Sequence, residues 1–72
     1  MERVRIVLVE PQEPMNLGAV ARAMRNFGLS RLYVVNPPPR VGPPWAKEAY
    51  WLAVHAEEVL EKAQVAGSLL EA

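Results

Sequence analysis

The residues of this chain with the clearest chemistry are Asn16, Gly18 and Arg22, which lie in the segment NLGAVARAMRNFG. A guanidinium is always charged in proteins and can make two parallel hydrogen bonds to an oxyanion. An asparagine and a glycine within about two helical turns of it add hydrogen-bonding groups and an unobstructed backbone. The pattern therefore predicts a site that meets an anion.

The elements around this segment must position the arginine. The apolar run VRIVLV precedes it and the run LYVV follows it. Runs with β-branched residues and no Pro or Gly suit strands buried in a parallel sheet, so we expect strands over 4–9 and 32–35. Between them, Asn16 is a good N-cap and Gly28 a good C′ residue for a helix over 17–27.

The apolar positions of this helix predict which of its sides is buried. At helical spacing they form one stripe, which consists of Leu17, Val20, Ala21, Met24 and Phe27. Phe27 is therefore expected in the core. Gly18, Arg22 and Arg25 cluster near the opposite side, so the helix displays its arginines away from the core.

The second half of the chain predicts one more helix and a short strand. Five of the seven prolines lie in 36–44, which we expect to be a stiff, extended connector. An alanine-rich stripe predicts a helix over 45–55, and AQVAG predicts a strand over 63–67. Strand, helix, strand and helix with short connections predict an α/β fold with a three-layer parallel sheet.

Residues 68–72 begin another helix, because Ser68 and Glu71 have the spacing of a capping box. The first turn of a helix fixes backbone without collecting packing energy, so a domain does not normally end there. We therefore expect the 72 residues to be the N-terminal segment of a longer domain.

The predicted helix over 45–55 carries apolar side chains on two sides. Tyr50, Trp51 and Val54 lie off its buried stripe, and exposed aromatic residues of this kind often mark an interface. His55 flanks the stripe, and a single histidine in such a place is far more often structural than catalytic.

Composition and charge exclude several classes of protein. No Cys and one His exclude disulfides, thiolate metal sites and a histidine metal cluster. No apolar run approaches the roughly 20 residues of a membrane span, and MERVRIVLV is not a signal peptide, so we expect a cytoplasmic protein. Residues 1–40 hold six Arg and three Glu, whereas 41–72 hold two Lys and five Glu. The basic half contains the Asn–Arg segment, and a basic patch is typical of nucleic-acid binding.

The stretch VRIVLVEPQEPMNLGAVARAMRNFGLSRLYVVNPP resembles the first motif, with its flanking strands, of the SpoU (TrmH) family of RNA ribose methyltransferases in the knotted SPOUT superfamily. The later stretch AVHAEEVLEKAQVAGSLLEA resembles the same family, so the resemblance covers nearly the whole chain. Both look most like the bacterial branch that methylates tRNA. The resemblance implies the N-terminal portion of an α/β-knot domain, with the knot itself outside this chain.

The resemblance also implies a function. The complete domain would transfer a methyl group from S-adenosylmethionine to a ribose 2′-hydroxyl of tRNA or rRNA, as a homodimer and without a metal. Asn16 and Arg22 match the pair that the family places near this hydroxyl. Gly18 would let the RNA backbone approach the helix start. Arg25 lies near Arg22, which makes it a candidate for contact with RNA phosphate, and the alternative for Arg25 is an ordinary solvent-facing position. The family's cofactor motifs come later in the domain and have no match here, so the 72-residue chain is expected to be inactive alone.

Two roles for Arg22 and two other functions remain open. In the family this arginine is proposed as a general base, but a guanidinium is always charged in proteins, which favours a phosphate clamp that orients the hydroxyl, helped by the positive end of the helix. The chain is alternatively a non-catalytic RNA-binding or dimerisation module, or part of a metabolic enzyme that binds a phosphorylated small molecule at 16–18. The plainest alternatives are structural: an N-cap at Asn16, a turn residue at Gly18 and a solvated helix face at Arg22.

Overall fold

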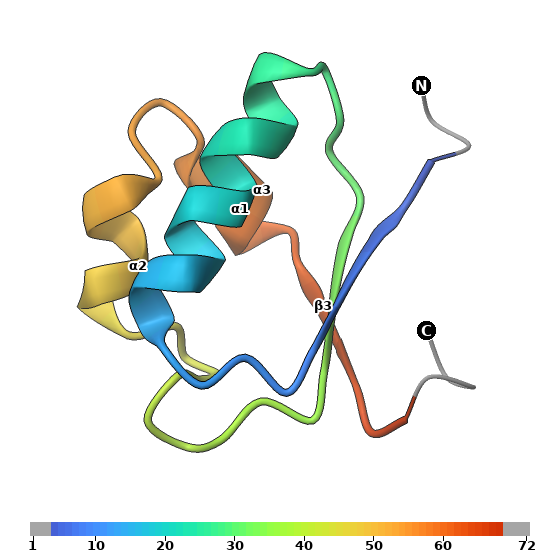
Figure 1. Cartoon of the computed structure of the whole chain (residues 1–72), viewed down its shortest axis with the longest axis vertical. Helices are drawn as coiled ribbons and strands as arrows, with labels where there is room; N and C mark the ends of the chain where they lie inside the picture. The colour runs from blue at the N-terminus through green and yellow to red at the C-terminus, as the bar shows by residue number, and fades with distance from the viewer. Residues whose placement is uncertain (1–3, 69–72) are drawn as a thin grey trace.

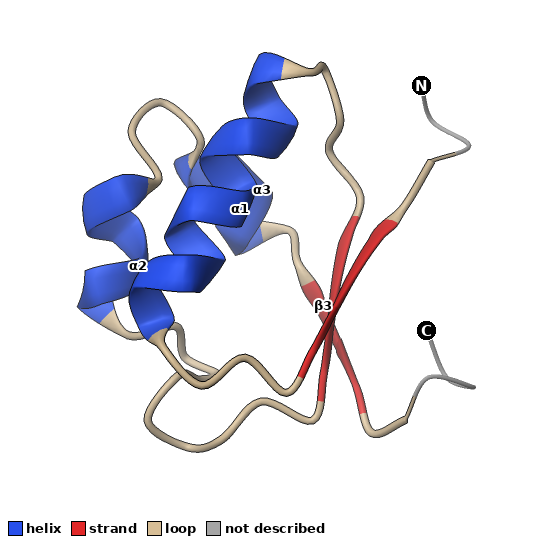
Figure 2. Ribbon diagram, viewed as in Figure 1, coloured by secondary structure: helices blue, strands red, loops and turns tan. Residues whose placement is uncertain are grey.

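Three parallel strands form one sheet, and three helices cover one face of it (Figures 1 and 2). The structure is a computed structural model that describes residues 4–68. The strands are β1 (Ile6–Val9), β2 (Leu32–Val35) and β3 (Gln64–Ala66), and the helices are α1 (Pro14–Asn26), α2 (Lys47–Leu52) and α3 (Glu57–Glu61). The predicted α/β class and parallel sheet are confirmed. Because all helices of the described residues lie on the same face, these residues form two layers rather than the expected three.

The core lies between the sheet and the helices. Ile6 pairs with Leu32, and Leu8 pairs with Val34. Leu32 and Val34 are buried, and Ile6 and Leu8 pack against the same cluster. Its other members are Leu17, Ala21, Met24, Val41, Ala49, Ala53, Ala56, Val59 and Leu60. Full burial of a leucine or valine side chain contributes about 1.5–3 kcal/mol, so this cluster holds the helices on the sheet.

Helix α1 begins earlier than the sequence predicts. Its N-cap is Glu13, which makes no side-chain capping bond, and Pro14 is its first residue. Asn16 lies in the first turn and its backbone N–H donates to the carbonyl oxygen of Glu13 (3.1 Å), so its prediction as the N-cap is wrong. The reason is Pro14, whose ring fixes a helical φ and whose missing N–H costs nothing at this position.

The end of α1 confirms one prediction and corrects another. Gly28 follows the C-cap with φ +75°, and the N–H groups of Gly28 and Leu29 donate to Arg25 (3.1 Å) and Met24 (2.8 Å), which is a Schellman motif. Phe27, however, is 75% exposed and is not a core residue. The helix ends before it, and Phe27 lies about 80° around the helix axis from the buried Leu17.

The proline-rich connector is folded into turns and is not extended as predicted. The backbone N–H of Val41 donates to the carbonyl oxygen of Pro38 (2.9 Å), and that of Ala46 donates to Val41 (2.9 Å). Val41 is completely buried. Burial of this one apolar side chain between the proline clusters requires the chain to turn back towards the core.

The predicted helix over 45–55 is shorter than expected, and a separate helix follows it. The chain leaves α2 after Leu52, and His55 adopts φ +61° in the turn before α3. Helix α3 was not predicted, because a helix of five residues depends on tertiary contacts. One such contact is the Trp45 indole N–H, which donates to the carbonyl oxygen of Leu60 (2.8 Å).

The remaining expectations for this half can be compared with the structure residue by residue. The short strand is confirmed as β3, which lies within 63–67. Tyr50 packs partly against the core, whereas Trp51 and Val54 are 58% and 46% exposed. His55 is exposed. Apart from Ser68, the predicted helix start lies outside the described residues.

Candidate functional site on helix α1

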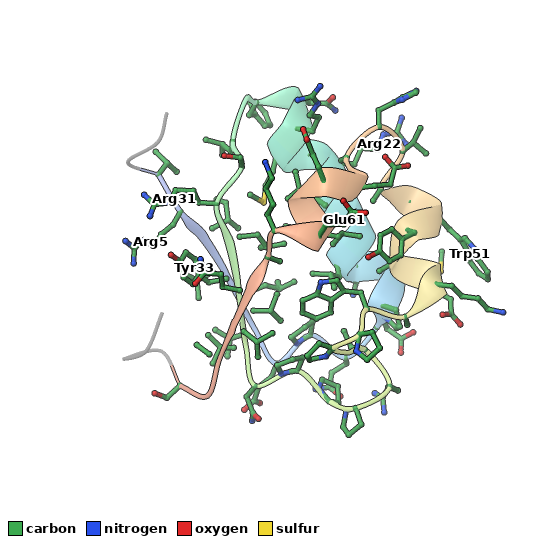
Figure 3. All side chains as sticks on the ribbon, turned by 180° about the vertical axis from the view of Figure 1, so that it is seen from behind. Arg5, Arg22, Arg31, Tyr33, Trp51 and Glu61 are labelled. Carbon is green, nitrogen blue, oxygen red and sulfur yellow. The ribbon has the colours of Figure 1, made fainter. Side chains whose placement is uncertain are left out.

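Asn16 and Arg22 are both on the exposed side of α1. The helix starts at the carboxyl edge of the sheet, shortly after β1, so Asn16 lies near that edge and Arg22 lies further along. Figure 3 shows Arg22 on the helix side of the molecule, away from the sheet. Within residues 4–68, neither side chain makes a hydrogen bond or an ion pair. Both groups are therefore available to a ligand.

Two alanines separate Asn16 from Arg22 on the helix surface. Residues six positions apart lie about 120° apart around a helix, and Ala19 and Ala23 fall between them. Both alanines are exposed. We refer to Asn16, Ala19, Arg22 and Ala23 as the α1 face. Because its central side chains are short, a ligand backbone can approach α1 closely between the amide and the guanidinium.

Gly18 is buried, and the absence of a side chain at this position permits another helix to approach α1 closely. A Cβ added at this position would overlap the carbonyl oxygen of Ala49 and would lie 2.9 Å from the carbonyl carbon and 3.3 Å from the Cβ of Leu52. Glycine at this position therefore allows α2 to pack directly on α1. Contact between Gly18 and RNA stays a prediction, whereas its packing role is a feature of the structure.

Arg25 is connected to α3 rather than standing alone on the helix. Its Nη1 lies 3.5 Å from Oε1 of Glu58, and both side chains are more than half exposed. An exposed ion pair of this kind contributes little free energy, about 0–1 kcal/mol. Arg25 can therefore exchange Glu58 for a phosphate at small cost, and its predicted contact with RNA remains a prediction.

A polar group at the carboxyl edge of the sheet was missed by sequence reasoning. Glu10 and Asn36 follow β1 and β2 directly, and both have positive φ, 48° and 49°. The Asn36 side-chain amide donates to Oε2 of Glu10 (3.2 Å), while Arg40 donates to the carbonyl oxygen and the side-chain oxygen of Gln12 (3.0 and 3.1 Å). The signal was present, because each apolar run ends in a polar residue, VLVE and YVVN. Asn16 lies towards the same edge, which is where α/β sheets commonly bind ligands.

The described residues do not identify a place for the methyl donor. A cavity of about 200 Å³ lies between the amino ends of β2 and β3, which is below the roughly 300–1,000 Å³ of small-molecule sites. Among residues 4–68, no group of three His, Cys, Asp or Glu could hold a metal ion, and no helix is long and apolar enough to cross a membrane.

Comparison with protein families and curated relatives gives consistent matches. The SpoU rRNA Methylase family matches residues 3–72. The tRNA (cytidine/uridine-2'-O-)-methyltransferase TrmJ of Pectobacterium atrosepticum is 44% identical over 72 residues, which are 100% of this chain and 28% of that protein. The tRNA (cytidine-2'-O-)-methyltransferase TrmJ of Methanocaldococcus jannaschii is 36% identical over 69 residues, which are 96% of this chain and 28% of that protein. The chain thus spans about 28% of the length of these curated relatives.

Solved structures show the same likeness in three dimensions. TrmJ from Z. mobilis ZM4 superposes with a TM-score of 0.84 at 43% identity, over 93% of this chain and 29% of that one. A probable methyltransferase from Bordetella pertussis Tohama I superposes with a TM-score of 0.83 at 38% identity, over 97% of this chain and 41% of that one. The sheet and the helices on its face are therefore shared with methyltransferases.

Proposed function

Because this chain belongs to the SpoU rRNA methylase family, we propose that it supplies the acceptor side of a site that methylates a ribose 2′-hydroxyl of RNA. The observation that carries the proposal is the α1 face, on which Asn16 and Arg22, both without a partner within residues 4–68, flank two small exposed residues. The proposed RNA is tRNA, since the relatives from Pectobacterium and Methanocaldococcus are named as tRNA methyltransferases. Ribosomal RNA is the second candidate.

In this proposal S-adenosylmethionine supplies the methyl group. The residues that bind it are outside the described part of the chain. Arg22 binds a phosphate beside the target ribose, because a guanidinium makes two parallel hydrogen bonds to phosphate oxygens. Asn16 hydrogen-bonds the ribose and fixes its hydroxyl, and the positive end of α1 lies beside it. Holding the nucleophile in a reactive geometry is the main demand of such a transfer. Arg22 orients the hydroxyl through the phosphate and does not act as its base, because a guanidinium has no acceptor. The hydroxyl proton passes to solvent water as the ribose oxygen bonds to the methyl carbon.

Ala19 and Ala23 have a part in this arrangement. An RNA backbone is bulky, and a larger side chain at either position would hold the ribose away from Asn16 and Arg22. In this proposal the two alanines leave room for the RNA backbone beside α1, while Gly18 packs against α2. The proposal therefore assigns the close approach of RNA to the α1 face.

The proposal extends to a homodimer that acts in the cytoplasm. Trp51 is 58% exposed and Phe27 is 75% exposed, and aromatic residues are enriched in protein interfaces. Light scattering of the purified protein gives its mass in solution directly. A mass that corresponds to the monomer at every concentration measured would contradict this part of the proposal.

The experiment uses a hybrid, in which this chain is followed by the part of Z. mobilis TrmJ that lies beyond the matched segment. Labelled S-adenosylmethionine and unmodified tRNA report methyl transfer. We expect transfer by the hybrid, and a loss of about 10²–10³-fold for Arg22→Ala, as for removal of one group that stabilises a transition state. Lys47→Ala, which removes an exposed cation from α2, is the control and should leave the rate unchanged.

Two results would overturn the proposal. Equal transfer by the hybrid and its Arg22→Ala variant would remove the role of Arg22. If the hybrid binds tRNA and S-adenosylmethionine but transfers no methyl group to tRNA or rRNA, the chain is an RNA-binding module instead. The 72-residue chain alone is expected to bind no S-adenosylmethionine in calorimetry, and binding would place the donor site within it.

A further inference from the structure

A cavity opens at the amino edge of the sheet, between the start of β2 and the start of β3. Its volume is about 200 Å³ and it is lined by Ser30, Arg31, Leu32, Tyr33, Lys62 and Gln64. Two of these residues are cationic, three others carry a hydroxyl or an amide, and none is acidic. Arg31 and Lys62 are both exposed. The lining therefore has the chemistry of an anion site.

A third cation lies beside this cavity. The guanidinium carbon of Arg5 is 5.2 Å from the centre of the Tyr33 ring, which holds it over the sheet by a cation–π contact. Figure 3 shows Arg5, Arg31 and Tyr33 together on the side of the sheet away from the helices. Glu61 precedes Lys62 in the chain but is not among the lining residues. Three positive charges thus gather around one depression, which we name the amino-edge pocket.

We propose that the amino-edge pocket binds a phosphate of the RNA backbone, at a point on the RNA remote from the methylated nucleotide. The phosphate oxygens accept hydrogen bonds from the Arg31 guanidinium and the Lys62 ammonium, and Ser30 and Gln64 add neutral donors. Such a contact positions an RNA without reading its sequence. The inference rests on the proposed function, because it takes RNA as the partner.

The position of the pocket supports a second contact with the same RNA. Arg22 lies on the helix side of the molecule, whereas two residues that line the pocket, Arg31 and Tyr33, lie on the sheet side (Figure 3). The molecule measures only 27 × 26 × 15 Å, so a tRNA-sized RNA is large enough to reach both. One contact would hold the target ribose and the other would fix the orientation of the RNA.

The test measures affinity of the 72-residue chain for fluorescein-labelled, unmodified tRNA by anisotropy. Lys62→Glu is compared with Lys47→Glu, which makes the same change of charge at an exposed lysine of α2. We expect Kd to rise about tenfold for Lys62→Glu and less than about threefold for Lys47→Glu, since only the first variant removes a charged group that binds phosphate. A double variant, Arg31→Ala with Lys62→Ala, tests the salt dependence of binding. The slope of log Kd against the logarithm of the salt concentration should fall by about 0.7–0.9 for each phosphate that this variant no longer neutralises. Circular dichroism confirms that each variant is folded.

Two results would overturn the inference. Equal effects of Lys62→Glu and Lys47→Glu would show that only net charge matters. The second result comes from a titration with inorganic phosphate alone, followed by the amide NMR signals of Ser30, Arg31 and Gln64. If their shifts saturate below about 1 mM phosphate, the pocket binds a small anion instead of RNA.

The hybrid separates this inference from the proposed function. Lys62→Glu should raise KM for tRNA and leave kcat within about twofold, because a positioning contact remote from the ribose adds the same binding energy to substrate and transition state. If the hybrid transfers methyl groups and Lys62→Glu leaves KM for tRNA unchanged, only the inference about the amino-edge pocket is refuted. If the hybrid binds tRNA tightly in a way that depends on Lys62 but transfers no methyl group, only the proposed methyltransferase function is refuted.

Discussion

Gly18 lies directly against the carbonyl group of Ala49, so that α1 and α2 contact each other through main-chain atoms. Both residues are completely shielded from solvent or nearly so. The contact fixes the position of α2 beside the α1 face. The contact also explains why position 18 is a glycine, since a larger residue would not fit against α2. A direct contact with a ligand would instead require Gly18 to be accessible.

Gly18→Ala should destabilise the fold. The added methyl group would overlap the carbonyl oxygen of Ala49, and overpacking of this kind costs about 1–3 kcal/mol. The higher helix propensity of alanine returns up to about 1 kcal/mol, so we expect a net loss of about 1–2 kcal/mol in urea unfolding. Ala23→Met, on the exposed side of the same helix, should change stability by less than about 0.5 kcal/mol. Unchanged or increased stability of Gly18→Ala would contradict the tight contact, and the RNA affinity of the folded variant tests its predicted contact with RNA separately.

Gly28→Ala should also destabilise the fold, but for a different reason. Gly28 has φ +75°, while a Cβ at this position would meet nothing within 4 Å. The cost is therefore one of backbone conformation, about 1–2 kcal/mol for a residue with a Cβ in the left-handed region. Gly28→Asn should lose less, because asparagine tolerates this region better. Urea unfolding of both variants checks the order, and a loss for asparagine as large as that for alanine would contradict it.

The sequence predicted the features that local chemistry decides. The strands β1 and β2 and the end of α1 at Gly28 follow from short apolar runs and one glycine, and the structure has them at or near the expected positions. The exposure of Arg22 followed from the phase of the helix. The start of α1 was misplaced because two start signals compete there, and Pro14 fixes the backbone before Asn16 can cap it.

The features that escaped prediction depend on residues far apart in the chain. Gly18 meets Ala49 only because α2 returns to α1 after β2 and the connector. Glu10 and Asn36, linked by a hydrogen bond, are brought together by strand pairing. Spacing along the sequence cannot show such contacts, so the packing role of Gly18 and the polar group at the carboxyl edge became visible only in the fold.

The ion pair between Arg25 and Glu58 should contribute little to stability. The two atoms are 3.5 Å apart and both side chains are more than half exposed, so water screens the attraction. A double-mutant cycle with Arg25→Ala and Glu58→Ala should give a coupling free energy below about 1 kcal/mol. A larger coupling would mean that Arg25 is committed to α3 and is a poor candidate for contact with RNA.

Phe27→Ala and Leu17→Ala should differ strongly although both residues were assigned to one apolar stripe. Leu17 is completely buried, and its truncation leaves a cavity in the core, which costs about 2–5 kcal/mol. Phe27 is 75% exposed beyond the end of α1, so its truncation should cost less than about 0.5 kcal/mol. Urea unfolding of the 72-residue chain at low micromolar concentration checks both values. If Phe27→Ala is as destabilising as Leu17→Ala at that concentration and less so on further dilution, Phe27 is covered by a second molecule, which would place it in the proposed homodimer interface.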